Sequence, residues 1–430
     1  MSRVYIFIWH YLPLRVTSNI RIKAFSKELA KDFDEVIIVA RQWEDEDNYA
    51  NKYYAETSNN SIKSIGENNI KIIHLPDNGR ISLKLARSLQ SFIILKKLYF
   101  YLYFILYKRE VANNFFEVFK LHEHEIMKDS GLDTFVICSA PVFNSLSIGH
   151  YLKINYGYKW VADYRDPWNF DSTNLYPDSF ISRIKKRLIK SKEGIYLKSA
   201  NGISVVANHI KKSFPAEFHV KTTLIFNGVD SDIDTNRINK FPNKFRIVYS
   251  GKLYKSQLKV ELFFISIKKF IDKNNIKPEN LELVFIGSIA NIDLIKIIEK
   301  YKLEEFVKCT EWVEKSIAYQ FMYEASCFLY LPFYNQSEIV STKQYTYLGM
   351  RKLILLPSTI NCEISEDLNK IEAWRVLFTI DEVYNEIHKL YFNFVNKVPA
   401  IIFTSNSDQI SMKNSAEKFR EFVSKIRYER

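Results

Sequence analysis

The chain has 430 residues, of which 47% are hydrophobic and 15% are aromatic, and its formal net charge is +12. This hydrophobic content is ample for packed cores, and the length predicts roughly two or three domains. The excess of positive charge predicts an anionic partner, which can be a nucleic acid, an acidic membrane surface or a phosphorylated ligand.

The four cysteines form no CxxC pair, and three of them lie in apolar runs typical of strands. We therefore expect reduced, buried thiols. The first residues, MSRVYIFIWHYLP, lack a small-residue cleavage site and are interpreted as a first strand, not a signal peptide. No apolar run reaches the ~20 residues of a membrane-spanning helix. We expect a cytoplasmic protein.

Short β-branched or aromatic runs, bounded by polar residues, recur through the first half of the chain. They are VYIFIW from Val4, EVIIVA from Glu35, IKIIHL from Ile70, TFVICS from Thr134, KWVADY from Lys159, GISVVA from Gly202 and TTLIFN from Thr222. Helix-like segments, such as residues 20–32, lie between most of these runs. The alternation predicts a parallel sheet with crossover helices.

The pattern stops at a polar stretch within residues 228–243 and then restarts. The later runs are FRIVYSG from Phe245, LELVFIG from Leu281, VKCTEW from Val307, CFLYLP from Cys327, KLILLP from Lys352 and RVLFTI from Arg375. We therefore expect an α/β protein with two Rossmann-like, doubly wound domains facing a cleft, at residues 1–228 and 229–400. Residues 401–430 are expected to contain a polar amphipathic helix that packs back toward the first domain.

Ligands of doubly wound sheets bind beyond the carboxyl ends of the strands. One such end is YSGKLYKSQLK, where Gly251 lets a ligand approach the backbone. Lys252, Lys255 and Lys259 follow it and can neutralise a diphosphate. The alternative is an ordinary turn with solvated lysines.

A second candidate segment is SEIVSTKQYTYLGM, residues 337–350. Ser341 and Thr342 can cap a helix whose free N–H groups and positive dipole end suit phosphate oxygens. Lys343 adds a full charge there, and Glu338 can accept hydrogen bonds from sugar hydroxyls. The alternative is a capped helix with a surface lysine.

Together these segments resemble the GT-B-fold glycosyltransferases, specifically glycosyltransferase family four and its relatives in bacterial surface-polysaccharide synthesis. The resemblance extends from about Tyr11 to Leu356, and the order and spacing of the segments is more specific than any one of them. The matching segments are YLPLRVTSNIR, SAPVFNSLSIGHYL, WVADYRDPW, NGVD, VYSGKLY, LVFIG, STKQYTYLGM and KLILL.

The resemblance implies a nucleotide-sugar donor site in the second domain. Lys252 matches one basic residue that binds the donor diphosphate, and Lys255 or Lys259 matches the other. Glu338 matches the first glutamate of the family's paired motif, which contacts the donor sugar. The second position, on the ribose, is Thr346, a departure that lacks the charge and reach for a bidentate grip on a diol.

The segment WVADYRDPW begins as a buried strand and ends in a cluster of charges. The resemblance implies that it ends where donor sugar and acceptor meet. Asp163 or Asp166 would then orient or deprotonate an acceptor hydroxyl, while Arg165 would steady the leaving phosphate or pair with either carboxylate. The alternative is a structural Asp–Arg–Asp ion-pair cluster.

The loop after the first strand, PLRVTSN, is another departure, because relatives often place glycines there. Thr17, Ser18 and Asn19 can supply hydroxyls, an amide and a helix cap instead. Either Arg15 or Arg21 is a candidate for facing the cleft.

No metal site is expected. The spacing of HEHE, residues 122–125, puts its two histidines on different helix faces. The resemblance likewise implies metal-independent chemistry without a cofactor, the nucleotide sugar being a substrate.

Two basic stretches in the first domain predict contact with an anionic inner membrane surface. Residues 80–109 contain seven Lys or Arg and no acidic residue, and SRIKKRLIKSK spans residues 182–192. The alternative is a buried aromatic helix and a solvated basic face. No nucleic-acid-reading motif accompanies the charge.

The leading hypothesis is a glycosyltransferase that moves a sugar from a nucleotide sugar to a saccharide or lipid-linked (polyprenyl-linked) acceptor, with retention, in capsule, O-antigen or exopolysaccharide synthesis. It would act at the inner face of the cytoplasmic membrane. The alternatives are a GT-B-fold sugar-nucleotide epimerase and a non-catalytic GT-B scaffold.

Overall fold

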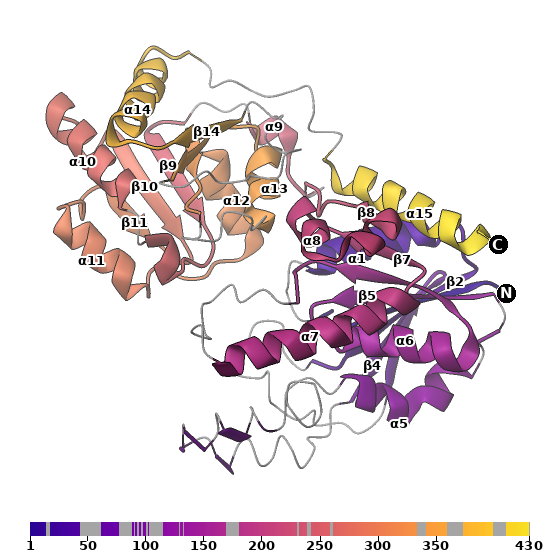
Figure 1. The fold of residues 1–430 in the computed structure, drawn as a ribbon. Helices are drawn as coiled ribbons and strands as arrows, with labels where there is room; N and C mark the ends of the chain where they lie inside the picture. Colours follow the sequence, from indigo (N-terminus) through magenta and orange to yellow (C-terminus); the bar gives the residue numbers. More distant parts are fainter. Residues whose placement is uncertain are drawn as a thin grey trace. The chain divides into compact units, whose positions relative to one another are not determined.

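The computed structural model describes residues 1–13, 18–43, 62–76, 88–89, 91–92, 94–95, 98–99, 102, 115–128, 130–131, 133–168, 180–229, 232–238, 242–258, 261–332, 341–358, 373–398 and 410–429. They form two compact units (Figure 1). Unit 1 comprises Met1–Phe226 and Ser415–Arg430, and unit 2 comprises Asn227–Asn414. None of the helices in these ranges is long and apolar enough to cross a bilayer.

Unit 1 contains an eight-stranded sheet with the order β3-β4-β2-β1-β5-β6-β7-β8. Its strands are β1 (Arg3–Ile8), β2 (Glu35–Arg41), β3 (Lys63–Glu67), β4 (Ile70–Leu75), β5 (Thr134–Ala140), β6 (Lys159–Tyr164), β7 (Gly202–Val205) and β8 (Thr222–Leu224). All neighbours are parallel except β3, which pairs antiparallel with β4. Parallel pairing aligns the carboxyl ends of β2, β1, β5 and β6 along one edge.

Helices cover both faces of this sheet. They are α1 (Ser18–Leu29), α5 (Phe115–Met127), α6 (Ser145–Tyr156), α7 (Phe180–Ser199), α8 (Asn208–Ser213) and α15 (Met412–Tyr428), with a 3-10 turn at Ala216–Lys221. On one face, β1 packs into a core with α1 and α15, in which Phe25 stacks on Phe419 with ring centroids 4.0 Å apart. On the other face, Phe7 contacts Phe119 of α5. Successive side chains of β1 point to opposite faces of the sheet, so this strand contributes to two hydrophobic cores.

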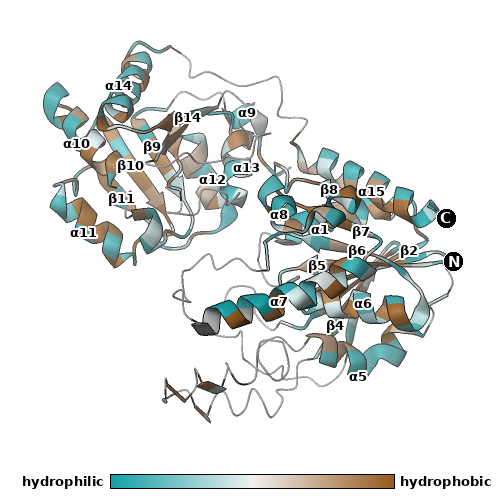
Figure 2. Ribbon diagram, viewed as in Figure 1, coloured by the Kyte–Doolittle hydropathy of each residue, from teal (hydrophilic) through white to brown (hydrophobic). Residues whose placement is uncertain are grey.

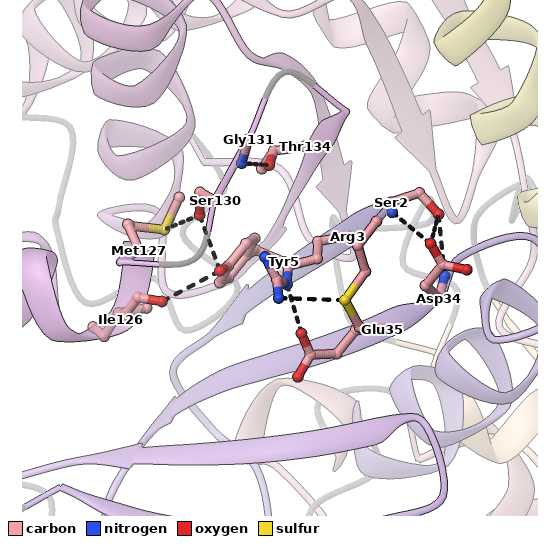
Figure 3. A network of polar contacts seen from close by, with 11 residues as sticks. Ser2, Arg3, Tyr5, Asp34, Glu35, Ile126, Met127, Ser130, Gly131 and Thr134 are labelled. Atoms are coloured by element: carbon pink, nitrogen blue, oxygen red, sulfur yellow. Dashed lines mark hydrogen bonds and ion pairs between the residues drawn. The ribbon is translucent and has the colours of Figure 1, made fainter.

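The amino edge of this sheet is closed by local polar pairs (Figure 3). Arg3 forms an ion pair with Glu35 at 2.6 Å, and the Ser2 amide donates to Asp34 at 2.7 Å. The Tyr5 hydroxyl donates to the carbonyl of Ile126. These side chains join neighbouring elements and are satisfied by one another, so this edge is structural.

Unit 2 contains a six-stranded parallel sheet with the order β11-β10-β9-β12-β13-β14. Its strands are β9 (Phe245–Ser250), β10 (Leu281–Ile286), β11 (Val307–Cys309), β12 (Cys327–Leu329), β13 (Ile354–Pro357) and β14 (Trp374–Leu377). Its helices are α9 (Thr235–Ile238), α10 (Leu262–Asn274), α11 (Ile292–Lys300), α12 (Lys315–Tyr323), α13 (Thr342–Gly349) and α14 (Ile380–Val395), with a 3-10 turn at Lys255–Leu258.

The second sheet is also covered on both faces. A large core joins β9, β10 and β13 to α10, α11 and α14, whose ribbons alternate between hydrophobic and hydrophilic stripes (Figure 2). On the opposite face, Tyr347 of α13 stacks on Phe328 with ring centroids 4.4 Å apart. The Tyr347 hydroxyl also accepts a hydrogen bond from the Ser250 amide at 2.8 Å. Together these contacts fix α13 beside the carboxyl end of β9.

The predicted fold class is confirmed: the protein is α/β, with two domains built on parallel sheets. Each predicted strand is present. The sequence analysis missed β3, an exposed edge strand whose KSIGE sequence carries charges and a glycine. It also missed the short helix α9, which lies inside the stretch expected to be a linker.

Candidate functional site

The carboxyl ends of β9 and β10 carry two glycines with left-handed backbones. Gly251 has a φ of +95° and Gly287 a φ of +76°, a region that side chains other than glycine rarely adopt. A Cβ atom placed on Gly251 would lie 3.0 Å from Cε of Lys343. Gly251 therefore provides both the turn after β9 and the space in which the Lys343 side chain lies.

Lys343, in the first turn of α13, points toward the end of β9. Its ammonium donates to the Tyr249 hydroxyl at 2.5 Å and to the backbone carbonyl of Lys252 at 2.9 Å. Burial lowers the pKa of Lys343 to about 7. None of these contacts supplies a negative charge, so an anion would interact more strongly with this ammonium than its present partners do.

The amino end of α13 is the second part of this site. Ser341 is its N-cap in an extended conformation, but its side chain makes no capping hydrogen bond, and among the described residues its buried Oγ has no partner. Thr342 begins the helix. The first N–H groups of an α-helix have no intrahelical acceptor, so this end offers donors and a positive dipole beside Lys343.

The other predicted donor-site residues are more exposed than Lys343, bonded within their own helix, or outside the described residues. Lys252 and Lys255 are exposed, and the Lys252 ammonium lies 5.0 Å from the centre of the Tyr254 ring. The Thr346 hydroxyl donates to the carbonyl of Thr342 at 3.3 Å. It therefore keeps acceptor capacity but is partly committed to the helix. Lys259 and Glu338 lie outside the described residues.

Asp163, at the end of β6, is fully buried in unit 1. It forms an ion pair with Arg21 at 2.8 Å, and Arg21 is itself only 1% exposed. It also accepts hydrogen bonds from Ser204 at 2.8 Å and Ser139 at 3.0 Å. Burial alone would raise the pKa of the Asp163 carboxyl, but Arg21 and these donors outweigh it and hold the pKa below its ordinary value.

This geometry favours the ion-pair alternative for Asp163, although its partner is Arg21 and not Arg165. A carboxylate with no exposure and three donors is poorly placed to take a proton from a substrate hydroxyl. The sequence analysis had given Arg21, with Arg15 as the alternative, as a first-loop candidate for facing the cleft. In the structure, Arg21 lies on α1 and points into the interior of unit 1.

The other two charges of the motif lie nearer the surface. Arg165 donates to the carbonyl of Pro141 at 2.6 Å and is partly exposed. Asp166 is exposed, yet the surrounding protein raises the pKa of its carboxyl, while Arg165 lowers it. Of the three predicted acceptor-side residues, these two are the ones a substrate can reach.

The first-loop residues are only partly described. Thr17 and Arg15 lie outside the described residues, as does the side chain of Ser18, at which α1 begins. Asn19 lies in the first turn of α1. The sequence analysis missed His10 and Arg41, which follow β1 and end β2 at the same sheet edge. Burial, then Arg165 and Arg41, lower the pKa of His10 to about 3, so the imidazole is neutral.

In unit 2, the sequence analysis missed Tyr249 and Gly287. Gly287 had a signal, since it follows the strand LELVFI as Gly251 follows FRIVYS. Tyr249 had none, because a strand tyrosine in an apolar run predicts only a core residue. Across the described ranges, no three His, Cys, Asp or Glu side chains are placed to hold a metal ion.

Solved structures with the same architecture are GT-B proteins. A trehalose-6-phosphate synthase from Burkholderia multivorans aligns with a TM-score of 0.59 at 7% identity, covering 99% of both chains. The Anabaena HepE protein, solved in complex with UDP-glucose, aligns with a TM-score of 0.54 at 12% sequence identity. The alignment covers 99% of this chain and 100% of the HepE chain. The protein has the GT-B fold.

The GT-B likeness is not confined to transferases. A putative UDP-N-acetylglucosamine 2-epimerase from Listeria monocytogenes aligns with a TM-score of 0.51 at 10% identity, covering 97% of this chain and 94% of its own. No protein-family model and no curated protein sequence matches the chain. At these identities the structural likeness establishes the GT-B fold, and function must be argued from the site.

Proposed function

We propose that the protein is a glycosyltransferase. It moves a sugar from a nucleotide-sugar donor to a saccharide or lipid-linked saccharide acceptor, with retention of configuration, in the synthesis of a bacterial surface polysaccharide. The observation that carries the proposal is the position of Lys343, whose side chain lies against Gly251 in the first turn of α13. Cationic charge and the amino end of a helix beside a strand's carboxyl end suit a diphosphate.

In this proposal unit 2 holds the donor. Gly251 permits close approach, and Lys343, Ser341 and Thr342 bind the diphosphate that departs when the anomeric carbon–oxygen bond breaks. Lys252, with Lys255 or Lys259, adds charge from the solvent side. Glu338 positions the sugar and Thr346 lies near the ribose. Because side chains and helix amides neutralise the diphosphate, the proposal requires no metal ion or cofactor.

Unit 1 is proposed to bind the acceptor. Of the predicted acceptor-side charges, Arg165 and Asp166 are accessible, and the raised pKa of the Asp166 carboxyl makes it a stronger base toward an acceptor hydroxyl. Asp163 is reassigned from catalysis to support of the backbone, since its oxygens are occupied by Arg21, Ser139 and Ser204.

Membrane contact is proposed for unit 1, because exposed charged and apolar side chains both occur there. Arg183, Lys186, Arg187 and Lys190 of α7 are exposed. Within residues 80–109, most of which lie outside the described part, Phe92, Ile94, Leu95, Leu98 and Leu102 are 48–81% exposed. Basic and apolar groups together favour an anionic bilayer. Co-sedimentation with phosphatidylglycerol vesicles should fall when Lys186, Arg187 and Lys190 become glutamine, and should be absent with phosphatidylcholine.

The decisive experiment is a thermal-shift and calorimetric screen against UDP-, GDP- and dTDP-sugars. We expect one series to bind, and Lys343→Met to weaken it about 10- to 100-fold, as expected for a lost charge-assisted contact. The matched control is Lys268→Met, a surface lysine of α10 paired with Asp272. If no sugar nucleotide binds the wild-type protein, the transferase proposal fails and the scaffold alternative replaces it.

The epimerase is the second candidate, supported by the structural likeness reported above. It would isomerise a nucleotide sugar without an acceptor. Incubating the protein with the nucleotide sugar that it binds, and with no acceptor, separates the transferase from the epimerase. A transferase leaves the anomeric and C2 configurations of that sugar unchanged over many turnover times. Accumulation of an epimer would exclude the transferase as the main activity.

A further inference from the structure

Two glutamines of unit 2 are buried near the carboxyl end of β9, and their amides differ in hydrogen bonding. Gln257, in the 3-10 turn after β9, is 5% exposed. Its oxygen accepts from the Tyr254 amide at 3.0 Å, and its nitrogen donates to the carbonyl of Leu331. Gln344, in the first turn of α13, is 2% exposed, and within the described residues its amide oxygen has no hydrogen-bond partner.

A buried amide oxygen without a partner destabilises the protein that contains it. Taking the oxygen out of water costs free energy, and no hydrogen bond within the described part of unit 2 offsets that cost at Gln344. Such atoms are uncommon in native structures, and each one calls for an explanation, such as a role in function or a bound molecule. An apolar side chain of similar length would fill the same volume without the cost. Glutamine at position 344 therefore indicates a role other than the stability of unit 2.

The position of Gln344 on α13 directs its amide toward the candidate donor site. Tyr347 lies one turn further along the same face of the helix, where its ring stacks on Phe328 of β12 and its hydroxyl meets the Ser250 amide at the end of β9. Residues three positions apart share a helix face, and helical side chains lean toward the amino end of their helix. Because α13 follows β12, its amino end lies at the carboxyl edge of the parallel sheet. Gln344 therefore extends past Tyr347 toward the ends of β9 and β12.

The neighbours of Gln344 in the first turn of α13 belong to the same candidate site. Gln344 directly follows Lys343, whose side chain lies against Gly251. The N-cap Ser341, three residues earlier, has a buried Oγ that also lacks a partner in the part of the chain that the structure describes. The first turn of α13 thus combines one ammonium with two buried polar atoms that a ligand can satisfy.

The chemistry of an amide oxygen limits the ligand group that it can bind. An amide oxygen accepts hydrogen bonds and cannot donate them, and the oxygens of an ionised diphosphate likewise only accept. The ligand partner of the Gln344 oxygen must therefore be a hydroxyl or N–H group close to the phosphates that Lys343 is proposed to bind. A nucleotide sugar carries a hydroxyl-bearing ring on each side of its diphosphate, namely the ribose and the transferred sugar.

We propose that the Gln344 amide accepts a hydrogen bond from a ring hydroxyl of the nucleotide-sugar donor. The inference rests on the proposed transferase function and adds a donor-binding residue to it. Thr346 is less available for this contact, because its hydroxyl already donates to the carbonyl of Thr342 at 3.3 Å. Since the bound ring supplies the partner that the amide lacks, donor binding and the stability of the free protein make opposite demands on position 344.

Thermal unfolding without ligand is the first test. Gln344→Met keeps the length and helix propensity of the side chain and removes the unpartnered oxygen, so the Tm of the full chain should rise by about 2–6 °C. Gln257→Met is the matched control, because it removes an amide that is hydrogen-bonded through both its oxygen and its nitrogen, and it should lower the Tm by a similar amount. An unchanged or lower Tm in Gln344→Met overturns the inference, because the amide then has a partner in the free protein.

Calorimetry is the second test, with three probes from whichever series the wild-type protein binds (UDP, GDP or dTDP). The probes are the nucleotide sugar, the nucleoside diphosphate alone and its dideoxyribose analogue. Gln344→Met should bind the nucleotide sugar about 5- to 20-fold more weakly than the wild type does. An equal loss for the nucleoside diphosphate, with no loss for the dideoxyribose analogue, assigns the contact to a ribose hydroxyl. A loss confined to the nucleotide sugar assigns it to the transferred sugar.

Failure of this inference and failure of the transferase proposal give different results. If the wild-type protein binds no sugar nucleotide, both fail. If the wild type binds one and Gln344→Met binds it equally well, the donor site is retained and the role of Gln344 alone is overturned. The expected result is a higher Tm together with a lower donor affinity, since replacing a purely structural glutamine would lower the Tm and would not distinguish the three probes.

Discussion

The carboxyl edges of the two sheets use buried charge in opposite ways. In unit 1, Asp163 is inaccessible, and Arg21, Ser139 and Ser204 donate to its oxygens. In unit 2, Lys343 is partly exposed, and within the described part of the chain its ammonium donates to neutral oxygens of Tyr249 and Lys252. The first arrangement has no need of a ligand, whereas the second gains from an anion.

The pKa values express the same difference. The pKa of the Asp163 carboxyl is held low because its charged form has partners, while burial lowers the pKa of Lys343 to about 7. Burial also lowers the pKa of Lys352, which precedes β13, to about 8, although its ammonium donates to the Tyr323 and Ala325 carbonyls, so a lowered lysine pKa does not by itself mark a binding site. A strand-end charge therefore indicates a binding site only where its partners leave it incompletely stabilised.

The largest expected effect is on the pH dependence of donor binding. Free Lys343, with a pKa of about 7, loses its charge as pH rises above 7. A diphosphate favours the ammonium and raises that pKa, so binding takes up a proton. Affinity should fall with rising pH by up to tenfold per unit, about 50-fold between pH 7, where half of Lys343 is charged, and pH 9.

Calorimetry in two buffers of different ionisation enthalpy measures this proton uptake directly. The Lys343→Met variant provides the control, because its affinity should not change over the same range. A wild-type affinity that is constant from pH 7 to pH 9 would show that Lys343 does not contact the ligand, and the contrast between the two sheet edges would then be lost.

A smaller effect is expected from filling the space above Gly251. Gly251→Ala places a Cβ atom 3.0 Å from Cε of Lys343 and should displace that side chain, lowering donor affinity about tenfold. Gly157→Ala is the matched control, since Gly157 also has a positive φ, +73°, but nothing lies within 4 Å of the added atom. Both should lose ~1–2 kcal/mol of stability. Equal donor affinity in the two variants would contradict the assigned role.

The smallest effect concerns α15, the returning helix of unit 1. Gly202→Ala on β7 would bring a Cβ atom 2.2 Å from Ile426 and 2.7 Å from Phe422, so the free energy of unfolding should fall by ~1–2 kcal/mol. Gly194→Ala on α7 meets no atom within 4 Å and should raise it by ~0.5–1 kcal/mol. Urea unfolding measures the free energy of unfolding of both variants. If Gly202→Ala leaves it unchanged, the side chains of α15 shift readily to accommodate the added methyl group.

The sheet strands could be predicted because each is a short apolar run between polar residues. VYIFIW and LELVFIG are apolar at nearly every position, so both faces of each strand can be buried, as in a parallel sheet covered by helices. The edge strand β3 could not be predicted, because its sequence KSIGE is exposed and its extended conformation depends on pairing with β4. The sequence also predicted helix at the C-terminus, where α15 lies, but the stacking of Phe419 on Phe25 is a tertiary contact.

The candidate donor site was predictable in its backbone and less so in its side chains. A glycine after a strand and a Ser-Thr-Lys helix start are local signals, and they identified Gly251, Ser341, Thr342 and Lys343. Tyr249, which accepts a hydrogen bond from Lys343, gave no signal because a buried tyrosine in a strand is ordinary. Glu338 and Lys259 lie outside the described residues, so their roles stay predictions.

The sequence by itself determined the fold class, since hydrophobic periodicity and the alternation of strands and helices act locally along the chain. It also located the strand ends at which charged and glycine residues gather. Tertiary structure alone decided what each charge does there, because the pairing of Asp163 with Arg21 joins residues 142 positions apart. Whether a strand-end charge is satisfied or available depends on which distant donors the packing brings to it.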